Sequence, residues 1–183
     1  MFTEKFGQLR KIGPVLAYCL VGHMGEGKNV ELVIEVFIEL YKRGSKAQIT
    51  FYGGTVERLE ELRNRYDLPP TIHFKGIVDE VSYHLHQCYL SASHTELFAN
   101  ACVEALNQGL LALLSDVEIA HRFYAGQSDA IRLFQNKAQL IQMIEEMEQP
   151  DFYLLNEKNL AWASRYSLGK VAQSYRELLD RNF

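Results

Sequence analysis

The feature that most constrains the fold is a short apolar run that ends in a glycine and leads into a helical repeat. Residues 15–21 (VLAYCLV) contain no charged residue, and Gly22 ends the run. An uninterrupted apolar segment of this length is typical of a strand buried on both faces, as in a parallel sheet. Apolar residues then recur at helical spacing over 30–41. The segment therefore predicts a strand, a glycine turn and a helix.

The same alternation of strand and helix continues along the chain. We expect further strands at 48–52, 71–74, 88–90, 110–114 and 130–134, and helices at 57–66, 79–86, 98–108, 137–147 and 168–182. Repeated β–α units with short loops predict an α/β fold, a doubly wound, Rossmann-like parallel sheet in one domain. Such sheets bind ligands outside the carboxyl ends of their strands. Functional residues are therefore expected in the loops 22–28, 53–54, 76–78, 91–98 and 115–118.

Composition excludes several classes of function. The 183 residues carry a net charge of -4, which argues against nucleic-acid binding but permits a small anionic ligand in a local pocket. Cys19, Cys88 and Cys102 have no metal-clip spacing, and their odd number favours reduced thiols and a cytoplasmic location. The apolar runs are too short to cross a bilayer, and no basic-then-apolar leader opens the chain, so we expect at most peripheral membrane association.

The first loop, from Gly22 to Lys28, has the form G-x-x-x-x-G-K. One interpretation is the phosphate loop of a magnesium-dependent nucleotide hydrolase, with Asp116 as the metal-holding acid. Asn29, however, stands where that loop has a Ser or Thr whose hydroxyl binds the metal. The glycines alone also suit a tight turn. Lys28 at a helix start still indicates an anion, because a cation is mildly unfavourable at that end of the helix.

The second motif is Glu96 and Glu104, seven residues apart in the form E-x7-E. Carboxylates accept hydrogen bonds from vicinal diols, so one would hold a ribose and the other a sugar ring. Backbone N–H groups of residues 97–100 would face an anion at the helix N-terminus. The alternative is a capping box, in which Ser93 and Glu96 simply satisfy the first turn of the helix.

Histidines near the fourth strand leave further interpretations open. His84, His86 and Cys88 alternate as H-x-H-x-C, which a metal site would use, although the sequence offers no evident fourth ligand. His94 stands beside Glu96 and would act as a base, as an orienting group or as an exposed loop residue.

Together these motifs resemble the carboxyl-terminal half of retaining glycosyltransferases with the GT-B fold, in glycosyltransferase family 4 (glycosyl transferases group 1). The matches run in order from about residue 15 to residue 179. The matching segments are Val21 to Asn29, Gly53-Gly54, His73 to Gly76, Ser93 to Ala99, Glu104 to Leu106 with Gly109, and Ser115-Asp116 with His121-Arg122.

The resemblance implies a donor site for a nucleotide sugar. Lys28 would neutralise the diphosphate, and Glu96 would contact the transferred sugar near the reaction centre; these two are the expected catalytic residues. Glu104 would bind the ribose. The further donor-binding residues implied are Gly22, His23 and Gly53 in the first two loops, Ile77, whose backbone would read the base, and the main chain of Phe98, Ala99 and Asn100, which would cradle phosphate.

The resemblance also implies the partners of the site. The substrate would be a UDP- or GDP-linked sugar in carbohydrate biosynthesis, with no metal and no other cofactor, because basic residues and a helix N-terminus neutralise the charge. The activity would be that of a hexosyltransferase-like enzyme. An amino-terminal acceptor domain, absent from this chain, would complete it, and helices in about 152–182 would cross back to that domain. We expect residues 1–183 alone to bind nucleotide and to transfer little.

Three positions depart from the family pattern. His23 replaces the usual Arg, Leu97-Phe98-Ala99 replaces Gly-Phe-Gly, and Leu111 replaces Pro. A neutral imidazole gives neither a fixed charge nor a bidentate fork. Three hypotheses follow: a donor-binding domain of an active transferase, a non-catalytic transferase-like subunit that pairs with an active partner, and the magnesium-dependent hydrolase.

Overall fold

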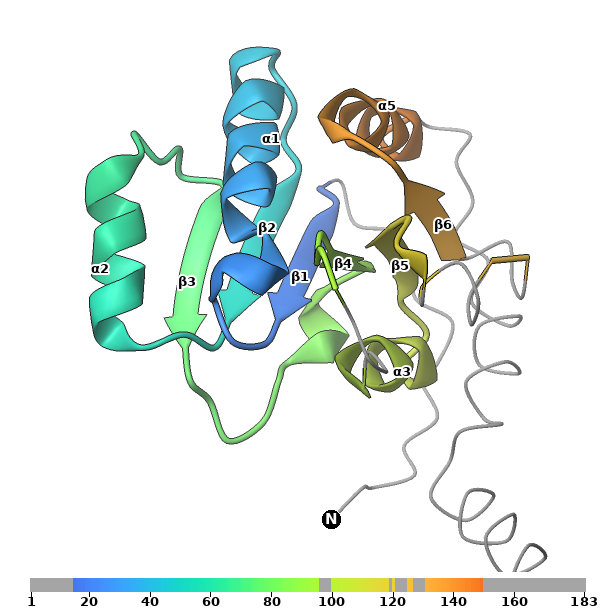
Figure 1. The fold of residues 1–183 in the computed structure, drawn as a ribbon. Helices are drawn as coiled ribbons and strands as arrows, with labels where there is room; N and C mark the ends of the chain where they lie inside the picture. The colour runs from blue at the N-terminus through green and yellow to red at the C-terminus, as the bar shows by residue number, and fades with distance from the viewer. Residues whose placement is uncertain (1–14, 96–99, 119, 121–124, 127–130, 150–183) are drawn as a thin grey trace, which may run out of the picture.

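One parallel sheet forms the centre of the molecule (Figure 1). The structure, a computed structural model, describes residues 15–95, 100–118, 120, 125–126 and 131–149. Within these residues six strands pair in the order β3-β2-β1-β4-β5-β6, and every pair is parallel. The strands are β1 (Ala17–Val21), β2 (Gln48–Tyr52), β3 (Ile72–Gly76), β4 (Cys88–Ser91), β5 (Leu111–Ser115) and β6 (Ile131–Phe134). The predicted doubly wound parallel sheet is confirmed.

Helices cover both faces of this sheet. The described helices are α1 (Val30–Lys42), α2 (Val56–Arg65), α3 (Asn100–Asn107) and α5 (Lys137–Met147), with two 3-10 turns, η1 (Glu26–Lys28) and η2 (Tyr83–Leu85). The predicted bounds hold for β2 and α5, and the other described elements differ by one or a few residues at their ends. The start of the predicted helix 98–108 and the helices in 152–182 lie outside the described residues.

The predicted helix over 79–86 is wrong. Only the 3-10 turn η2 forms there. The chain must cross from β3, at one edge of the sheet, past β2 and β1 to β4. A helix advances about 1.5 Å per residue and an extended chain about 3.3 Å, so a helix would leave this connection too short.

The core has two halves, one on each face of the sheet. Tyr18 and Leu20 pack with α1, α2 and α5, whereas Cys19 packs with Cys102 and Leu106 of α3. Successive side chains of a strand point to opposite faces. Both faces of β1 are therefore covered, which explains why its sequence is apolar without alternation. In Figure 1, α3 accordingly lies across the sheet from α1 and α5.

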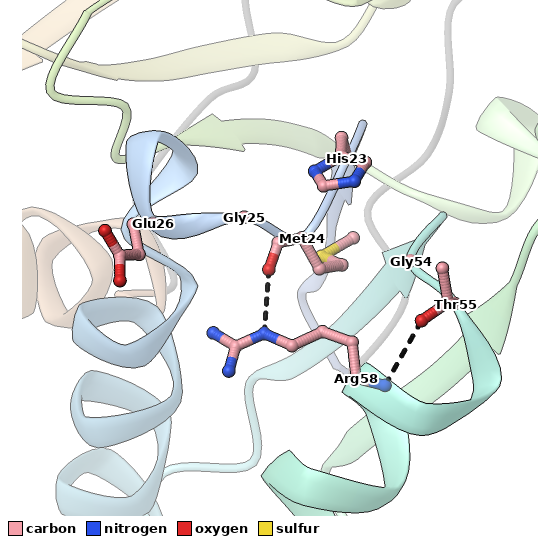
Figure 2. A pocket seen from close by; sticks show the side chains of 7 residues that line it. All are labelled: His23, Met24, Gly25, Glu26, Gly54, Thr55 and Arg58. Carbon is pink, nitrogen blue, oxygen red and sulfur yellow. Dashed lines mark hydrogen bonds between the residues drawn. The ribbon is translucent and has the colours of Figure 1, made fainter.

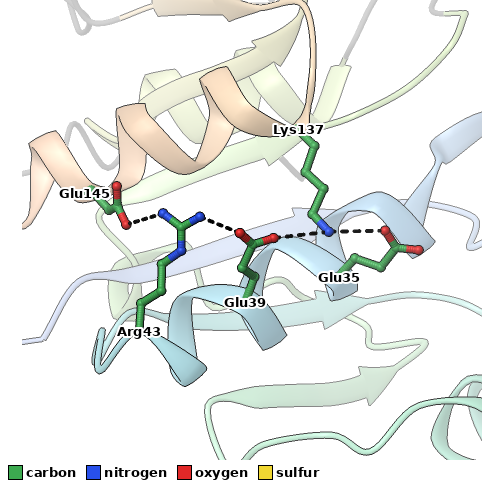
Figure 3. A network of polar contacts seen from close by, with 5 residues as sticks. All are labelled: Glu35, Glu39, Arg43, Lys137 and Glu145. Atoms are coloured by element: carbon green, nitrogen blue, oxygen red, sulfur yellow. Dashed lines mark hydrogen bonds and ion pairs between the residues drawn. The ribbon is translucent and has the colours of Figure 1, made fainter.

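Charged side chains join α1 to α5 (Figure 3). Lys137 Nζ lies 3.4 Å from Glu35 Oε2 and 3.3 Å from Glu39 Oε2. Arg43 pairs with Glu39 and donates to Glu145 Oε1 at 3.0 Å. These groups are partly exposed, so solvent screens their attraction. They select which faces of the two helices meet, while the buried apolar residues beneath them supply most of the stability.

The three cysteines, Cys19, Cys88 and Cys102, are buried, and none of them forms a disulfide among the residues that the structure describes. No helix in the described part of the chain combines the length and apolar composition that crossing a membrane requires.

Candidate functional site

Glycines hold the ends of three neighbouring strands together at the carboxyl edge of the sheet. Gly22 N–H donates to Tyr52 O at 2.9 Å, and Gly53 N–H donates to Gly76 O at 2.6 Å. A Cβ atom on Gly53 would lie 2.2 Å from Gly22 O, and the φ of Gly53 is 110°. Because no side chain fits there, Gly53 is required for the close approach of the two loops.

The loop after β1 folds back on itself and brings Lys28 over the strand end. Lys28 N–H donates to Gly25 O at 3.0 Å, which closes η1. A Cβ atom on Gly22 would lie 3.3 Å from Lys28 Cε and 3.8 Å from Nζ, so the ammonium group passes close to Gly22. Asn29 has φ 49° in the left-handed region, which Asn tolerates better than the Ser or Thr of a phosphate loop. The departure at Asn29 therefore has a backbone reason.

The loops after β1 and β4 meet where these two neighbouring strands end. This is the switch point of the sheet, because β2 and β3 lie on one side of β1 and β4, β5 and β6 lie on the other. The N–H of His94 donates to the carbonyl of Gly27 at 2.9 Å. Ser93 is buried, its hydroxyl lies 3.0 Å from Ser91 Oγ, and its carbonyl accepts from Ser115 Oγ at 2.5 Å. The loop that carries Lys28 therefore contacts the loop after β4 at the switch point of the sheet, where open α/β sheets bind ligands.

Part of the predicted site lies outside the described residues. Glu96, Phe98 and Ala99 are not described, and neither is the predicted capping box, which involves Glu96. Asn100 opens the described part of α3 and is exposed. The described segment that ends at Thr95 contacts the loop that carries Lys28 through the hydrogen bond from His94 N–H to Gly27 O.

Glu104 lies on α3, half-buried, and has a partner that the sequence did not reveal. The phenol of Tyr83, on η2, donates a hydrogen bond to Glu104 Oε2 at 3.0 Å. Burial raises the pKa of Tyr83, and the charge of Glu104 raises this pKa further. The phenol therefore stays neutral and keeps its proton for the carboxylate. The sequence does contain an aromatic residue between β3 and β4, which is Tyr83. The predicted helix over 79–86 gave no reason to place its phenol beside Glu104.

A cavity of about 280 Å³ opens between the first loop and the start of α2 (Figure 2). Its lining residues are His23, Met24, Gly25, Glu26, Gly54, Thr55 and Arg58. Arg58 Nε donates to Met24 O at 2.9 Å, while its guanidinium pairs with Glu31 and, at 2.8 Å, with Glu61. His23 lines this cavity, and Lys28 and Glu104 do not. Sequence reasoning missed Arg58, which lies on an amphipathic helix with several other charges.

The chain matches one protein family over most of its length. The model of the family described as glycosyl transferases group 1 matches residues 2–151. The chain belongs to this family. No curated protein matches it in sequence.

Solved glycosyltransferase structures share the fold of this group 1 domain. The GtfA/B complex superposes with a TM-score of 0.76 at 19% identity, covering 91% of this chain and 36% of that chain. HepE of Anabaena, in complex with UDP and glucose, gives 0.77 at 15% identity, with 90% of this chain and 48% of that chain covered. The group 1 domain therefore spans less than half the length of these two proteins.

A third structure matches over most of its own length. It is the C-terminal domain of a glycosyl transferase group 1 family protein, LpcC, from Francisella tularensis. The TM-score is 0.66 at 14% identity, with 82% of this chain and 85% of that chain covered. The Rossmann-like fold of GT-B glycosyltransferases is thus confirmed for this chain.

Ile77, whose backbone is predicted to read the base, lies just beyond β3 in this group 1 domain. It follows β3 directly and is 81% exposed, so its backbone lies at the open edge of the sheet.

The metal interpretation of His84, His86 and Cys88 is wrong. His86 is buried against Tyr52, with Nε2 3.0 Å from the phenol oxygen, Cys88 is buried in β4, and His84 is exposed. Among the described residues no three His, Cys, Asp or Glu side chains converge on a metal position.

Proposed function

We propose that this domain binds the nucleotide-sugar donor of a retaining glycosyltransferase of family 4. The donor would be UDP- or GDP-linked, and its sugar would pass to an acceptor hydroxyl without a metal ion. One observation carries the proposal: the hydrogen bond from His94 N–H to Gly27 O, which joins the Lys28 loop to the segment leading to Glu96. This contact supports the proposal because it joins the loop that carries Lys28 to the loop after β4, and open α/β sheets bind ligands at this switch point.

Each part of the donor then has a proposed partner. The Lys28 ammonium group binds the diphosphate, together with the main-chain N–H groups of Phe98, Ala99 and Asn100. The Glu104 carboxylate accepts hydrogen bonds from the ribose hydroxyls. The backbone at Ile77, on the exposed edge, binds the base.

The first two loops and Glu96 complete the proposed site. The close approach of Gly22 and Gly53 leaves backbone without side chains beside the proposed diphosphate position, and His23 lies in the same loop as Lys28. Glu96 contacts the transferred sugar next to the reaction centre.

The proposed chemistry rests on charge stabilisation. The bond between the sugar and the diphosphate breaks, and negative charge develops on the leaving group. Lys28 and the dipole of α3 stabilise that charge where it forms, which lowers the barrier. A metal ion is not needed for this role when a fixed cation and backbone N–H groups supply it.

The acceptor half of the reaction is proposed to lie in a second domain. The chain covers 36% and 48% of the GtfA/B and HepE structures, which supports a larger two-domain enzyme. Residues 1–183 alone would then bind donor and transfer little or no sugar.

Nucleotide titration tests the proposal directly. UDP and GDP are titrated in the presence of EDTA, and binding is followed by calorimetry and by amide NMR signals of residues 22–29 and 100–107. We expect binding without metal, and Lys28→Ala should weaken it roughly 10- to 100-fold, the range for a hydrogen bond to a charged group. Lys137→Ala, on the helix face paired with α1, is the matched control and should bind as the unaltered chain does.

Two other results would replace the proposal. Strong enhancement of ATP or GTP binding by magnesium would favour the phosphate-loop hydrolase. No nucleotide binding up to millimolar concentration would favour the non-catalytic subunit.

A further inference from the structure

We propose that Tyr83 is a positioning residue that orients the Glu104 carboxylate for the ribose hydroxyls of the donor. It thereby determines how strongly the domain prefers a ribonucleotide over its deoxy counterpart. The inference rests on the proposed function, since it assumes that Glu104 receives the ribose. It assigns a role to a residue that the E-x7-E motif does not contain.

The geometry makes Tyr83 a donor to Glu104. Its hydroxyl lies 3.0 Å from Glu104 Oε2 and 3.3 Å from the carbonyl oxygen of Ala101. Both neighbours only accept hydrogen bonds, and the phenol has one proton. The shorter contact to the charged oxygen takes that proton, because charge-assisted hydrogen bonds are the stronger ones.

Tyr83 itself is held in a fixed place. Tyr83 is 8% exposed and packs in the core half that includes Cys102 and Leu106 of α3. His86 N–H donates to Tyr83 O at 3.0 Å, and the imidazole of His86 contacts the phenol of Tyr52 on β2. The turn that carries Tyr83 is therefore tied to the sheet, so its phenol is a rigid reference point for Glu104.

A tether of this kind has a specific effect on binding. A free glutamate samples many rotamers, and binding must immobilise it. The hydrogen bond from Tyr83 selects one orientation before the ligand arrives. It uses one acceptor position on Oε2 and leaves Oε1, and the remaining lone pair of Oε2, for a vicinal diol.

The effect should therefore appear only with ligands that have ribose hydroxyls. The unaltered chain and Tyr83→Phe are titrated with UDP and with 2′,3′-dideoxy-UDP, and with the guanine pair if GDP binds more tightly. We expect Tyr83→Phe to weaken UDP binding roughly 3- to 10-fold, as for the loss of one hydrogen bond, and to leave dideoxy-UDP binding unchanged. The ratio of the two affinities falls by that factor.

Controls separate positioning from general damage. Tyr18→Phe removes another buried phenol, one that contacts Met147 Sδ on the opposite face, and should leave the affinity ratio unchanged. The ratio is also insensitive to a partly unfolded sample, because both ligands are affected alike. Tyr83→Leu serves as a second phenol-free variant, with thermal unfolding followed for each protein.

The outcomes distinguish the two proposals. If the unaltered chain binds no nucleotide, or binds UDP and dideoxy-UDP equally, the proposed ribose contact of Glu104 is wrong and the inference falls with it. If the unaltered chain prefers UDP but both phenol-free variants keep its affinity ratio, Tyr83 does not position Glu104 and the inference alone is overturned.

Discussion

At the scale of single residues, the candidate site depends on backbone positions with positive φ, which glycine and asparagine tolerate best. Gly53 N–H donates to Gly76 O, and its Cα faces Gly22 O. Asn29, in the left-handed region, ends η1 and begins α1. These residues shape the loop that carries Lys28. Their identity follows from backbone sterics rather than from chemistry.

Gly53→Ala should therefore be strongly destabilising. The added Cβ would lie 2.2 Å from Gly22 O at a φ of 110°, so the two loops would have to separate. We expect a loss of about 3 kcal/mol in the free energy of unfolding, measured by urea denaturation. Gly27→Ala is the matched control, since a Cβ atom there meets nothing within 4 Å, and it should change stability by less than about 1 kcal/mol. Equal losses in the two variants would contradict the steric argument.

At the scale of elements, Arg58 connects α2 to the loop after β1 and to the first turn of α1. Its side chain reaches Met24 O, Glu31 and Glu61 (Figure 2 shows the contact with Met24). Thr55 caps α2 by accepting from Arg58 N–H at 3.3 Å, which fixes where the helix begins. One guanidinium thus ties α2, the loop after β1 and α1 together, while the His94 N–H joins the same loop to the loop after β4.

Arg58→Ala should loosen that loop. It removes the hydrogen bond to Met24 O and leaves the half-buried Glu31 carboxylate without this cation, so we expect unfolding to become easier by about 1–3 kcal/mol. Hydrogen exchange of the amides of residues 24–29 should accelerate before that of β1. Arg63→Ala, at an exposed position of the same helix over the ring of Phe74, should leave this exchange unchanged. Unaltered exchange in Arg58→Ala would show that the loop is held by other contacts.

At the scale of the whole molecule, α1 and α5 join distant parts of the chain. Lys137 and Glu35 are 102 positions apart, and so are Glu145 and Arg43. This helix pair closes the layer that covers β1, β4 and β5, including Tyr18, Phe37 and Ile144. The carboxyl edge of the sheet with its loops stays outside this layer, so the helix pair does not cover the candidate site.

The pH dependence of folding should report on this pair of helices. Hydrogen bonds from Arg43 and then Lys137 hold the pKa of Glu39 below its ordinary value of 4.5. A lowered pKa in the folded state means that the carboxylate stabilises the fold above the unfolded-state pKa, and that this contribution disappears as the pH falls through the folded-state value. We expect the unaltered chain to lose stability between about pH 5 and pH 3 more steeply than Glu39→Gln does. Identical slopes in thermal unfolding across this range would contradict the prediction.

Much of the fold could be predicted because its signals are local. The apolar run before Gly22 and the helical repeat after it already specify one β–α unit, and Gln48–Tyr52 and Lys137–Met147 have the predicted bounds. Lys28 and the segment before Glu96 were expected at the same edge because parallel strands end together. The helix expected over 79–86 failed for the opposite reason. Its local pattern is helical, but the distance that the chain must cover is set by the order of the strands.

Periodicity along the chain thus determined the sequence of strands and helices, and with it which loops would meet. Only the tertiary structure decided the partners within the site: Tyr83 beside Glu104, 21 positions away, and Arg58 on Met24 O, 34 positions away. Local pattern carries no information about such pairs, because they depend on how separate elements pack. Once the elements are packed, the length and burial of the Tyr83 and Arg58 side chains determine which of the nearby acceptors each one reaches.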